Sequence, residues 1–429
     1  MSARVLVLSE DPVRGEMGGN AIRAYELANV LSAHADVTLA SPSSSPAGTV
    51  AQVAFDREDP RALRALLRGV DVVVTLPQNP VVTAEVRRSG ARVVYDLYDP
   101  KPLQLLEAFS AAGRLTQRYW ARIALDHVMD ALAGGDRLIC ASERQRDLWI
   151  GAMLGAGLIT PALYANDPTL RSLIEVVPFG VSERPPQVID DGPLERFTAL
   201  ERSHEIVLWN GGLWNWLDPV SAVEAIARVV EVRPQARLVF MGRAPQHPRE
   251  RVAADAARER AEQLGMLERV VFFNDAWVPY DRRAGWLLGA DCALSMHVEH
   301  LETRFSFRTR LLDCFWSGLP VVCTEGDELA EQVERKQLGI SIAQRDPQGA
   351  AAAILTILAN GREAYREPLA AVADSYHWSV VAAPLVRYVA ELEGRGSARL
   401  QRRTPPGRWT RAALTRTGRA VLRRLAALR

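Results

Sequence analysis

Short runs of apolar residues recur along the 429-residue chain, and a segment with helical periodicity follows most of them. RVLVLS (4–9), DVVVTL (71–76) and DRLICAS (136–142) are three of these runs. They are apolar at nearly every position rather than at every second one, which is typical of strands in a parallel sheet covered on both faces. Such strands in alternation with helices predict an α/β fold with doubly wound parallel sheets.

The alternation of strands and helices occurs twice. A second series begins at EIVLW (205–209) and continues to GISI (339–342). Between the two series, residues 182–204 are rich in proline and acidic residues and show no strong period, which is typical of a linker. Because the chain is also too long for one core, we expect two Rossmann-like domains, at residues 1–182 and 183–375.

Charge is nearly balanced over the whole chain, with 52 basic and 51 acidic residues, which argues against a nucleic-acid-binding protein. The distribution is uneven, because residues 394–429 contain 11 arginines and no acid. A helix over the last part would place Leu414 and Val421 on one side and Arg416 and Arg419 on the other. Such a segment suits an anionic membrane surface, and the alternative is a flexible, solvated tail.

The cysteines indicate a reducing compartment. They lie in apolar runs without the spacing of a metal site, and so they are expected to be reduced core thiols of a cytosolic protein. The N-terminus does not resemble a signal peptide, and no apolar run approaches the length of a membrane span. We therefore expect a cytoplasmic protein that the basic tail can hold at the inner face of the membrane. The four cysteines of the chain are Cys140, Cys292, Cys314 and Cys323.

Acids and arginines gather in one segment, residues 295–323, that otherwise has the composition of a buried core. Strand-like runs flank it, and a helix between them would carry an apolar stripe and end at Gly318 in a left-handed cap. Glu302, Arg304 and Arg308 then lie near the start of that helix, beside the carboxyl end of a strand. Open α/β sheets bind their ligands at this edge, where helix N-termini favour anions.

Two loops of the first domain also follow strands directly. Gly18 and Gly19 permit a turn close to a ligand, and Asn20 can cap the next helix; an ordinary turn is the alternative. The G-x-G-x-x-G dinucleotide fingerprint is absent there. In the second loop, Tyr98 and Asp99 could bind an acceptor hydroxyl, although Asp99 followed by proline can simply begin a helix.

Three motifs together resemble a known family. Gly18-Gly19 before a helix, VPFGV (177–181) and LLDCFWSGLPVV (311–322) are similar to nucleotide-sugar glycosyltransferases of the two-Rossmann-domain (GT-B) type, in the large retaining family four. The resemblance extends over almost all of residues 1–393. It implies an acceptor-binding first domain, a donor-binding second domain, and a segment at 376–393 that crosses back to the first domain. We expect Gly18 and Gly19 to contact the donor, and Asn20, Tyr98 and Asp99 to bind the acceptor hydroxyl.

The resemblance also assigns roles to the acids. Asp313 matches the family's second acid, which binds the ribose hydroxyls; a surface acid is the alternative. The first acid would fall on Phe305 and is lost, so Glu302, or less favourably Glu299, must replace it. Glu302 would bind the hexose and favour the positive charge that develops at the anomeric carbon. A plain acid at a helix start is the alternative for Glu302.

The largest departure from the family concerns the cations that bind the diphosphate. Relatives carry an arginine and a lysine where this chain has Gly212 and approximately Leu217. Gly211 and Gly212 can still offer backbone N–H groups, and we expect Arg308 and Arg304 to supply the charge, unless they form structural salt bridges. We expect Arg310 to point away. Two further positions resemble the donor pocket, namely Gly242 at a strand end and Trp277 in the base-reading loop.

The resemblance implies retaining, metal-independent transfer of a sugar from a nucleotide-diphosphate sugar to a hydroxyl. No metal motif and no nucleophile motif is present in the sequence. The acceptor is expected to be a glycan, a lipid-linked glycan or a small molecule, in cell-envelope or exopolysaccharide synthesis. Two alternatives remain open, which are a non-catalytic GT-B partner subunit and a soluble natural-product glycosyltransferase.

Overall fold

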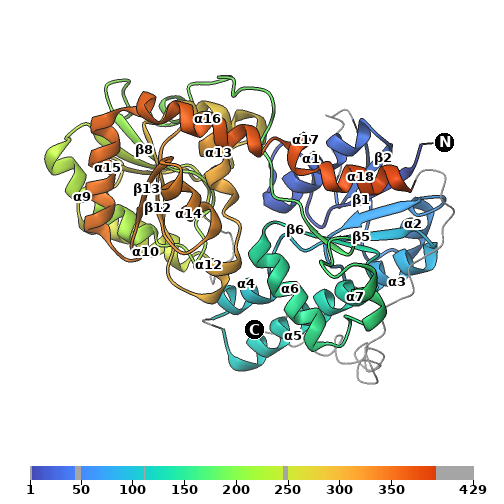
Figure 1. Ribbon diagram of the computed structural model, residues 1–429. Helices are drawn as coiled ribbons and strands as arrows, with labels where there is room; N and C mark the ends of the chain where they lie inside the picture. Colours follow the sequence, from blue (N-terminus) through green and yellow to red (C-terminus); the bar gives the residue numbers. More distant parts are fainter. Residues whose placement is uncertain (1, 44–49, 111, 245–249, 393–429) are drawn as a thin grey trace.

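The computed structural model describes residues 2–43, 50–110, 112–244 and 250–392, which form two α/β domains side by side (Figure 1). The first domain contains a seven-stranded sheet with the order β3-β2-β1-β4-β5-β6-β7, and the second a six-stranded sheet with the order β10-β9-β8-β11-β12-β13. Every strand pair is parallel. The expectation of two Rossmann-like domains is confirmed, and the basic tail lies outside the described residues.

The first domain follows the alternation that the sequence predicts. Its strands are β1 (Arg4–Leu8), β2 (Asp36–Ser41), β3 (Ala51–Ala54), β4 (Val72–Thr75), β5 (Arg92–Asp96), β6 (Arg137–Cys140) and β7 (Ile174–Val176). Its helices are α1 (Gly19–Ser32), α2 (Pro60–Leu66), α3 (Pro80–Ser89), α4 (Lys101–Ala108), α5 (Arg114–Gly134), α6 (Glu143–Gly155) and α7 (Pro161–Asn166).

The second domain repeats the arrangement, after a short helix α8 (Pro193–Arg196) in the linker. Its strands are β8 (Glu205–Trp209), β9 (Ala236–Phe240), β10 (Val271–Phe273), β11 (Cys292–Ser295), β12 (Val321–Thr324) and β13 (Gly339–Ile342). The helices are α9 (Pro219–Val232), α10 (Val252–Gln263), α11 (Arg283–Leu288), α12 (Leu301–Phe305), α13 (Thr309–Ser317), α14 (Glu328–Arg335), α15 (Pro347–Asn360) and α16 (Arg366–Ser375).

Buried apolar side chains form one cluster within each domain and a third cluster that extends through both domains. The shared cluster includes Val5 of β1, Phe179 of the connection and Leu311 of α13. Central strands such as β4 and β12 are buried along their whole length, as expected for parallel strands with helices on both faces. The four cysteines are free and buried in these cores.

The chain crosses between the domains twice on one side. After α16, the helices α17 (Trp378–Val381) and α18 (Ala383–Glu391) lie along the first domain (Figure 1), and α17 contacts α1. The Val181 N–H donates to Tyr376, and the Trp378 N–H donates to Val181. Gly180 permits this close approach, because a Cβ there would lie 2.6 Å from the Trp378 ring. The two crossing segments therefore hold each other.

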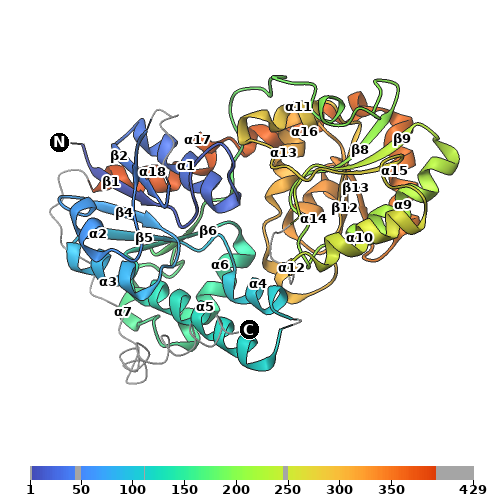
Figure 2. The same cartoon turned by 180° about the vertical axis from the view of Figure 1, so that it is seen from behind.

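The domains also touch on the other side of the boundary. The Gln145 side-chain amide donates to the carbonyl oxygens of Tyr98 at 2.8 Å and Phe305 at 2.9 Å, so it joins the two domains. Helix α12 contacts both α4 and α6, and Figure 2 shows α4 and α12 next to each other. The carboxyl ends of strands in both sheets therefore meet near this boundary.

The central charged segment forms two helices rather than the single helix expected from its periodicity. Helix α12 ends at Phe305, Ser306 has an extended backbone, and α13 begins at Thr309. Phe307 is buried in the shared core and Ser306 Oγ donates to the Thr303 carbonyl, which together interrupt the helix. The expected left-handed cap at Gly318 is confirmed, with a φ of 65°.

One buried ion pair connects α1, β5 and the segment after β7. The Arg23 guanidinium donates to Asp96 Oδ2 at 2.5 Å and to Asp96 Oδ1 at 3.1 Å. It also donates to the carbonyl oxygens of Val177 and Pro178, each at 2.8 Å. The two side chains are only 1% and 6% exposed. A buried charge pair is stable only when its hydrogen bonds are satisfied in this way.

We predict that Arg23→Met will lower the free energy of unfolding by about 3–5 kcal/mol, because it leaves the Asp96 carboxylate buried and unpaired. The matched control is Arg366→Met, which removes an exposed arginine paired with Glu363 and should cost less than about 1 kcal/mol. Denaturant unfolding followed by circular dichroism measures both. Equal losses for the two variants would contradict the assigned role of the buried pair.

Candidate active site

The first half of the site lies at the N-terminus of α1. Asn20 was expected to cap this helix, and that expectation is wrong. Gly18 is the N-cap, with an extended backbone, and Asn20 lies inside the first turn. The Asn20 side chain instead hydrogen-bonds Asp99. Gly19 lies against Tyr98, because a Cβ at Gly19 would be 3.0 Å from the Tyr98 hydroxyl. The structure therefore brings the predicted Gly18, Gly19, Asn20, Tyr98 and Asp99 together.

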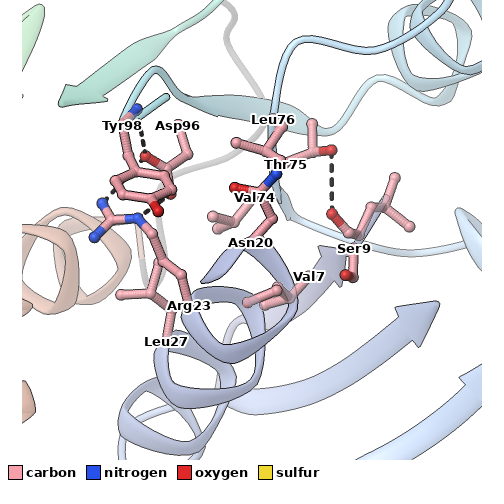
Figure 3. Close-up of a pocket in the computed structure, with 12 residues that line it drawn as sticks. Val7, Ser9, Asn20, Arg23, Leu27, Val74, Thr75, Leu76, Asp96 and Tyr98 are labelled. Atoms are coloured by element: carbon pink, nitrogen blue, oxygen red, sulfur yellow. Dashed lines mark hydrogen bonds and ion pairs between the residues drawn. The ribbon is translucent and has the colours of Figure 1, made fainter. Parts of the chain in front are cut away.

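A small pocket opens between these loops at the carboxyl ends of β1, β4 and β5 (Figure 3). Asn20 and Tyr98 line it together with the Arg23–Asp96 pair. The Arg23 guanidinium lies over the Tyr98 ring, 4.9 Å from its centroid, and fixes the ring at the edge of the sheet. Burial of the hydroxyl raises the pKa of Tyr98, so Tyr98 is neutral and able to donate or accept a hydrogen bond.

Asp99 lies close to the second domain. Burial raises the pKa of its carboxyl, the Lys101 ammonium opposes this shift, and the nearby Glu302 carboxylate adds to it. Lys101 Nζ lies 3.8 Å from Asp99 Oδ2. A carboxyl of the first domain and a carboxyl of α12 therefore face the same small region between the domains.

Glu302 is 2% exposed and belongs to a chain of buried charged groups at the carboxyl ends of β11 and β12. It accepts a hydrogen bond from Arg308 Nη2 at 3.0 Å, and Arg308 Nε lies 3.9 Å from Asp327 Oδ2. Asp327 is in turn 3.5 Å from the buried His297. The structure thus pairs the two residues predicted to be catalytic, Glu302 and Arg308, with each other, which matches the salt-bridge alternative for Arg308.

Arg310 does not point away from the site, and that expectation is wrong. Because the helix breaks before Thr309, Arg310 lies in the first turn of α13, and its Nη2 donates to the Gly212 carbonyl at 3.2 Å. Its Nη1 is buried and has no hydrogen-bond partner within the described part of the chain. Burial, and secondarily the neighbouring Arg308, lowers the pKa of Arg310 to about 9. A partly desolvated cation therefore lies beside the glycine loop, and none of the described residues forms a salt bridge with it.

The backbone geometry of this loop explains why glycine occupies several of its positions. Gly211 has a φ of +101°, which side chains other than glycine rarely adopt. Gly242 packs on the Gly211 carbonyl so closely that no Cβ fits. Gly212 carries the carbonyl that Arg310 contacts. The turns after β8 and β9 therefore support each other next to Arg310.

Asp313 is bonded to an arginine that the sequence analysis did not single out. Arg283 Nε donates to Asp313 Oδ1 at 3.1 Å, and the Arg283 guanidinium lies over the Tyr280 ring at 3.7 Å. The Tyr280 hydroxyl donates to Glu26 of α1 at 3.0 Å, and burial raises the pKa of that carboxyl. The Asp313 side chain is 33% exposed beside this interdomain network, and only its Oδ1 is bonded to Arg283.

The remaining predicted donor residues lie at the surface. Trp277 is 39% exposed in the loop after β10. Arg304 is exposed, and its guanidinium lies 5.8 Å from the ring centroid of the adjacent Phe305. It forms no ion pair with any residue that the structure describes. The break between α12 and α13 separates Arg304 from Arg308, which a continuous helix would have placed on one face. The roles of Trp277 and Arg304 stay predictions.

No group of three or more histidine, cysteine, aspartate or glutamate side chains is arranged to hold a metal ion within the described segments. No helix among those segments is both long enough and apolar enough to cross a membrane.

Comparison with known proteins identifies the class. Residues 204–360 match the family model of group 1 glycosyl transferases. The fold is similar to that of WaaG, a glycosyltransferase involved in lipopolysaccharide biosynthesis, with a TM-score of 0.63 and 16% identity over 91% of this chain and 100% of that chain. No curated protein sequence gave a match.

Two further solved structures share the two-domain fold. Anabaena HepE in complex with UDP and glucose has a TM-score of 0.64 and 14% identity, over 91% of this chain and 100% of that chain. Sucrose-phosphate synthase from Thermosynechococcus elongatus has a TM-score of 0.59 and 15% identity, over 91% and 99%. The fold is therefore GT-B. Together with the family match of the second domain, it indicates that the protein is a glycosyltransferase.

We predict that Asp99→Asn will stabilise the protein increasingly as pH rises. Because the pKa of Asp99 is raised in the folded state, the folded protein binds this proton more tightly than the unfolded chain. The wild type then loses stability as pH rises above about 4 through the folded pKa, and asparagine does not titrate. Thermal unfolding at pH 5 and pH 8 compares the variant with Asp281→Asn, which changes an exposed carboxyl. A constant difference between wild type and Asp99→Asn would contradict this assignment.

Proposed function

We propose that the protein transfers a sugar from a nucleotide-diphosphate sugar to a hydroxyl acceptor, with retention of configuration and without a metal ion. The observation that carries the proposal is the unpaired, desolvated Arg310 beside the turn at Gly211 and Gly212. A leaving nucleoside diphosphate needs cations and N–H donors where its negative charge develops.

Arg310 supplies a positive charge at the turn where the family's usual cations are missing. A buried guanidinium without a carboxylate is costly, and an anion that enters the site removes this cost. Arg310 projects from the first turn of α13, where backbone N–H groups also favour negative charge. The guanidinium presents planar N–H donors that match phosphate oxygens. This arrangement supports active donor binding over a non-catalytic partner subunit.

The remaining residues take roles on either side of the diphosphate. Glu302 and Asp99 lie at the domain boundary, where a hexose from the donor and a hydroxyl from the acceptor would meet. Arg308 hydrogen-bonds Glu302 and so fixes the position of its carboxyl group. Asp313, with one oxygen bonded to Arg283, keeps a second oxygen for a ribose hydroxyl. In this scheme the leaving phosphate assists deprotonation of the acceptor.

We propose a uridine diphosphate sugar as the first donor to test. Anabaena HepE has been solved with UDP and with UDP-glucose, and its fold is similar to that of this chain. We further propose an envelope or exopolysaccharide acceptor, because WaaG acts in lipopolysaccharide biosynthesis and the tail of this chain is basic. A soluble natural-product glycosyltransferase would instead retain full activity when residues 394–429 are deleted.

We predict that Arg310→Ala will weaken UDP binding by about 1.5–3 kcal/mol, the usual value of a hydrogen bond to a charged group. This corresponds to a loss of about ten- to hundredfold in affinity, measured by isothermal titration calorimetry. Stability should change little, because the loss of the hydrogen bond to the Gly212 carbonyl and of the contact with the Trp209 ring is offset by removal of a partly desolvated charge. UDP serves as the probe because it carries the diphosphate and lacks the sugar.

The matched control is Arg304→Ala, which removes an exposed cation from the neighbouring helix. If Arg304→Ala weakens UDP binding and Arg310→Ala does not, the diphosphate lies outside the α13 turn. If neither UDP nor GDP, dTDP or ADP binds the wild type, the non-catalytic subunit becomes the better description.

A further inference from the structure

Arg283, the first residue of α11, is held against two aromatic rings beside α13. Its guanidinium carbon lies 3.7 Å from the centroid of the Tyr280 ring and 4.6 Å from that of Trp316. The side chain is only 11% exposed. Its Nη1 donates to the Tyr280 carbonyl at 2.7 Å, and its Nε donates to Asp313 Oδ1 at 3.1 Å. The ring contacts and the hydrogen bonds together leave this guanidinium little freedom to move.

Both rings are themselves fixed by segments outside the second sheet. The Tyr280 N–H donates to the Gly15 carbonyl at 3.0 Å, and the Tyr280 hydroxyl donates to Glu26 at 3.0 Å. Gly15 and Glu26 belong to the first domain, before α1 and within it. Trp316 Nε1 donates to the Arg184 carbonyl of the linker at 2.9 Å. The guanidinium therefore rests on rings that are anchored to the first domain and to the linker.

Asp313 differs from a carboxylate that only pairs with an arginine inside a core, because its side chain is 33% exposed. It lies on α13 three residues after Arg310, so the two side chains project from the same side of the helix. Three residues span about 4.5 Å along a helix axis. This spacing is of the same order as that between the phosphates and the ribose hydroxyls of a nucleotide. A nucleotide whose diphosphate meets Arg310 can therefore present its ribose to Asp313.

We infer that Arg283 is a positioning residue, which fixes the Asp313 carboxylate for the ribose hydroxyls of the donor and so lets the site distinguish ribose from a ribose without these hydroxyls. The inference rests on the proposed function, which assigns Asp313 to the ribose. A carboxylate binds a hydroxyl more tightly when its position is fixed before the ligand arrives. The bond from Arg283 Nε fixes it, because rotation of the carboxylate would break that bond.

The shape of arginine matters here as well as its charge. A guanidinium is planar, so Arg283 can lie on the Tyr280 ring while Nε and Nη1 donate to two different acceptors. A lysine ammonium is a compact charge at the end of a flexible chain and does not reproduce these contacts together. Lysine at this position should therefore hold Asp313 poorly, although it keeps the positive charge.

The test compares UDP with 2′,3′-dideoxyuridine diphosphate, which lacks both ribose hydroxyls, by isothermal titration calorimetry of the full-length protein. The wild type should bind UDP about tenfold more tightly than the dideoxy compound. Arg283→Met should lower the affinity for UDP about tenfold and leave the affinity for the dideoxy compound unchanged, so that the preference disappears. Arg283→Lys should lose most of the preference too. GDP and ADP are measured in the same way with their own dideoxy analogues.

Further variants show whether Arg283 acts through Asp313. Asp313→Ala should also abolish the preference for UDP. Adding Arg283→Met to Asp313→Ala should then lower the affinity for UDP no further, because both substitutions remove the same interaction. The matched control is Arg282→Met, which changes the neighbouring arginine. Arg282 is 53% exposed and lies 3.6 Å from Asp190, and its loss should leave the preference as in the wild type.

The outcomes separate the inference from the function on which it rests. Equal weakening of UDP and its dideoxy analogue by Arg283→Met would mean that the arginine only supports the fold, and would overturn the inference. Equal binding of the two compounds by the wild type would overturn it as well, although nucleotide binding would stand. A wild type that binds none of the nucleotides would reject the proposed function and the inference with it. Thermal unfolding checks that each variant is folded, and Arg283→Lys carries the test if Arg283→Met is not.

Discussion

The free-energy cost of burying charge at the domain boundary determines how this protein is arranged. Most ionised groups there meet a partner of opposite sign, as in Arg23 with Asp96 and Arg308 with Glu302. Such pairing offsets the loss of hydration. Arg310 differs, because its neighbours are the Gly212 carbonyl oxygen, the Trp209 ring at 5.8 Å and another arginine. No carboxylate pairs with Arg310 within the described residues, and under the proposed function the diphosphate takes that place.

Much of the fold could be predicted from the sequence because parallel sheets buried on both faces leave a strong local pattern. Runs such as those at 71–76 and 339–342 became β4 and β13, and Gly318 adopted the expected cap. The break at Ser306 was missed because the apolar periodicity continues through it. What interrupts the helix is the burial of Phe307 in a core shared with distant residues, and local periodicity does not contain that information.

The site was predictable only in part, for a similar reason. Resemblance located the loops at Gly18 and Asn20 and the helix with Asp313, because these motifs are local. Arg283 contacts Asp313 across 30 positions of the sequence, and Arg310 contacts the glycine turn across 98 positions. Local motifs do not contain contacts over such separations. A continuous helix would direct Arg310 away from the site, whereas the start of α13 at Thr309 brings it beside the glycine turn.

The double crossing at Val181 and Trp378 has a mechanical consequence for substrate entry. Since the two segments hydrogen-bond each other there, separation of the domains on that side would break these backbone bonds, and a hinge would lie at that edge. The opposite rim is held by a few polar contacts, among them the Gln145 amide that bridges both domains. Water can replace these contacts at little net cost when the rim opens. Admission of a donor and departure of its spent nucleotide would then require a swing of one lobe about that edge rather than any local unfolding.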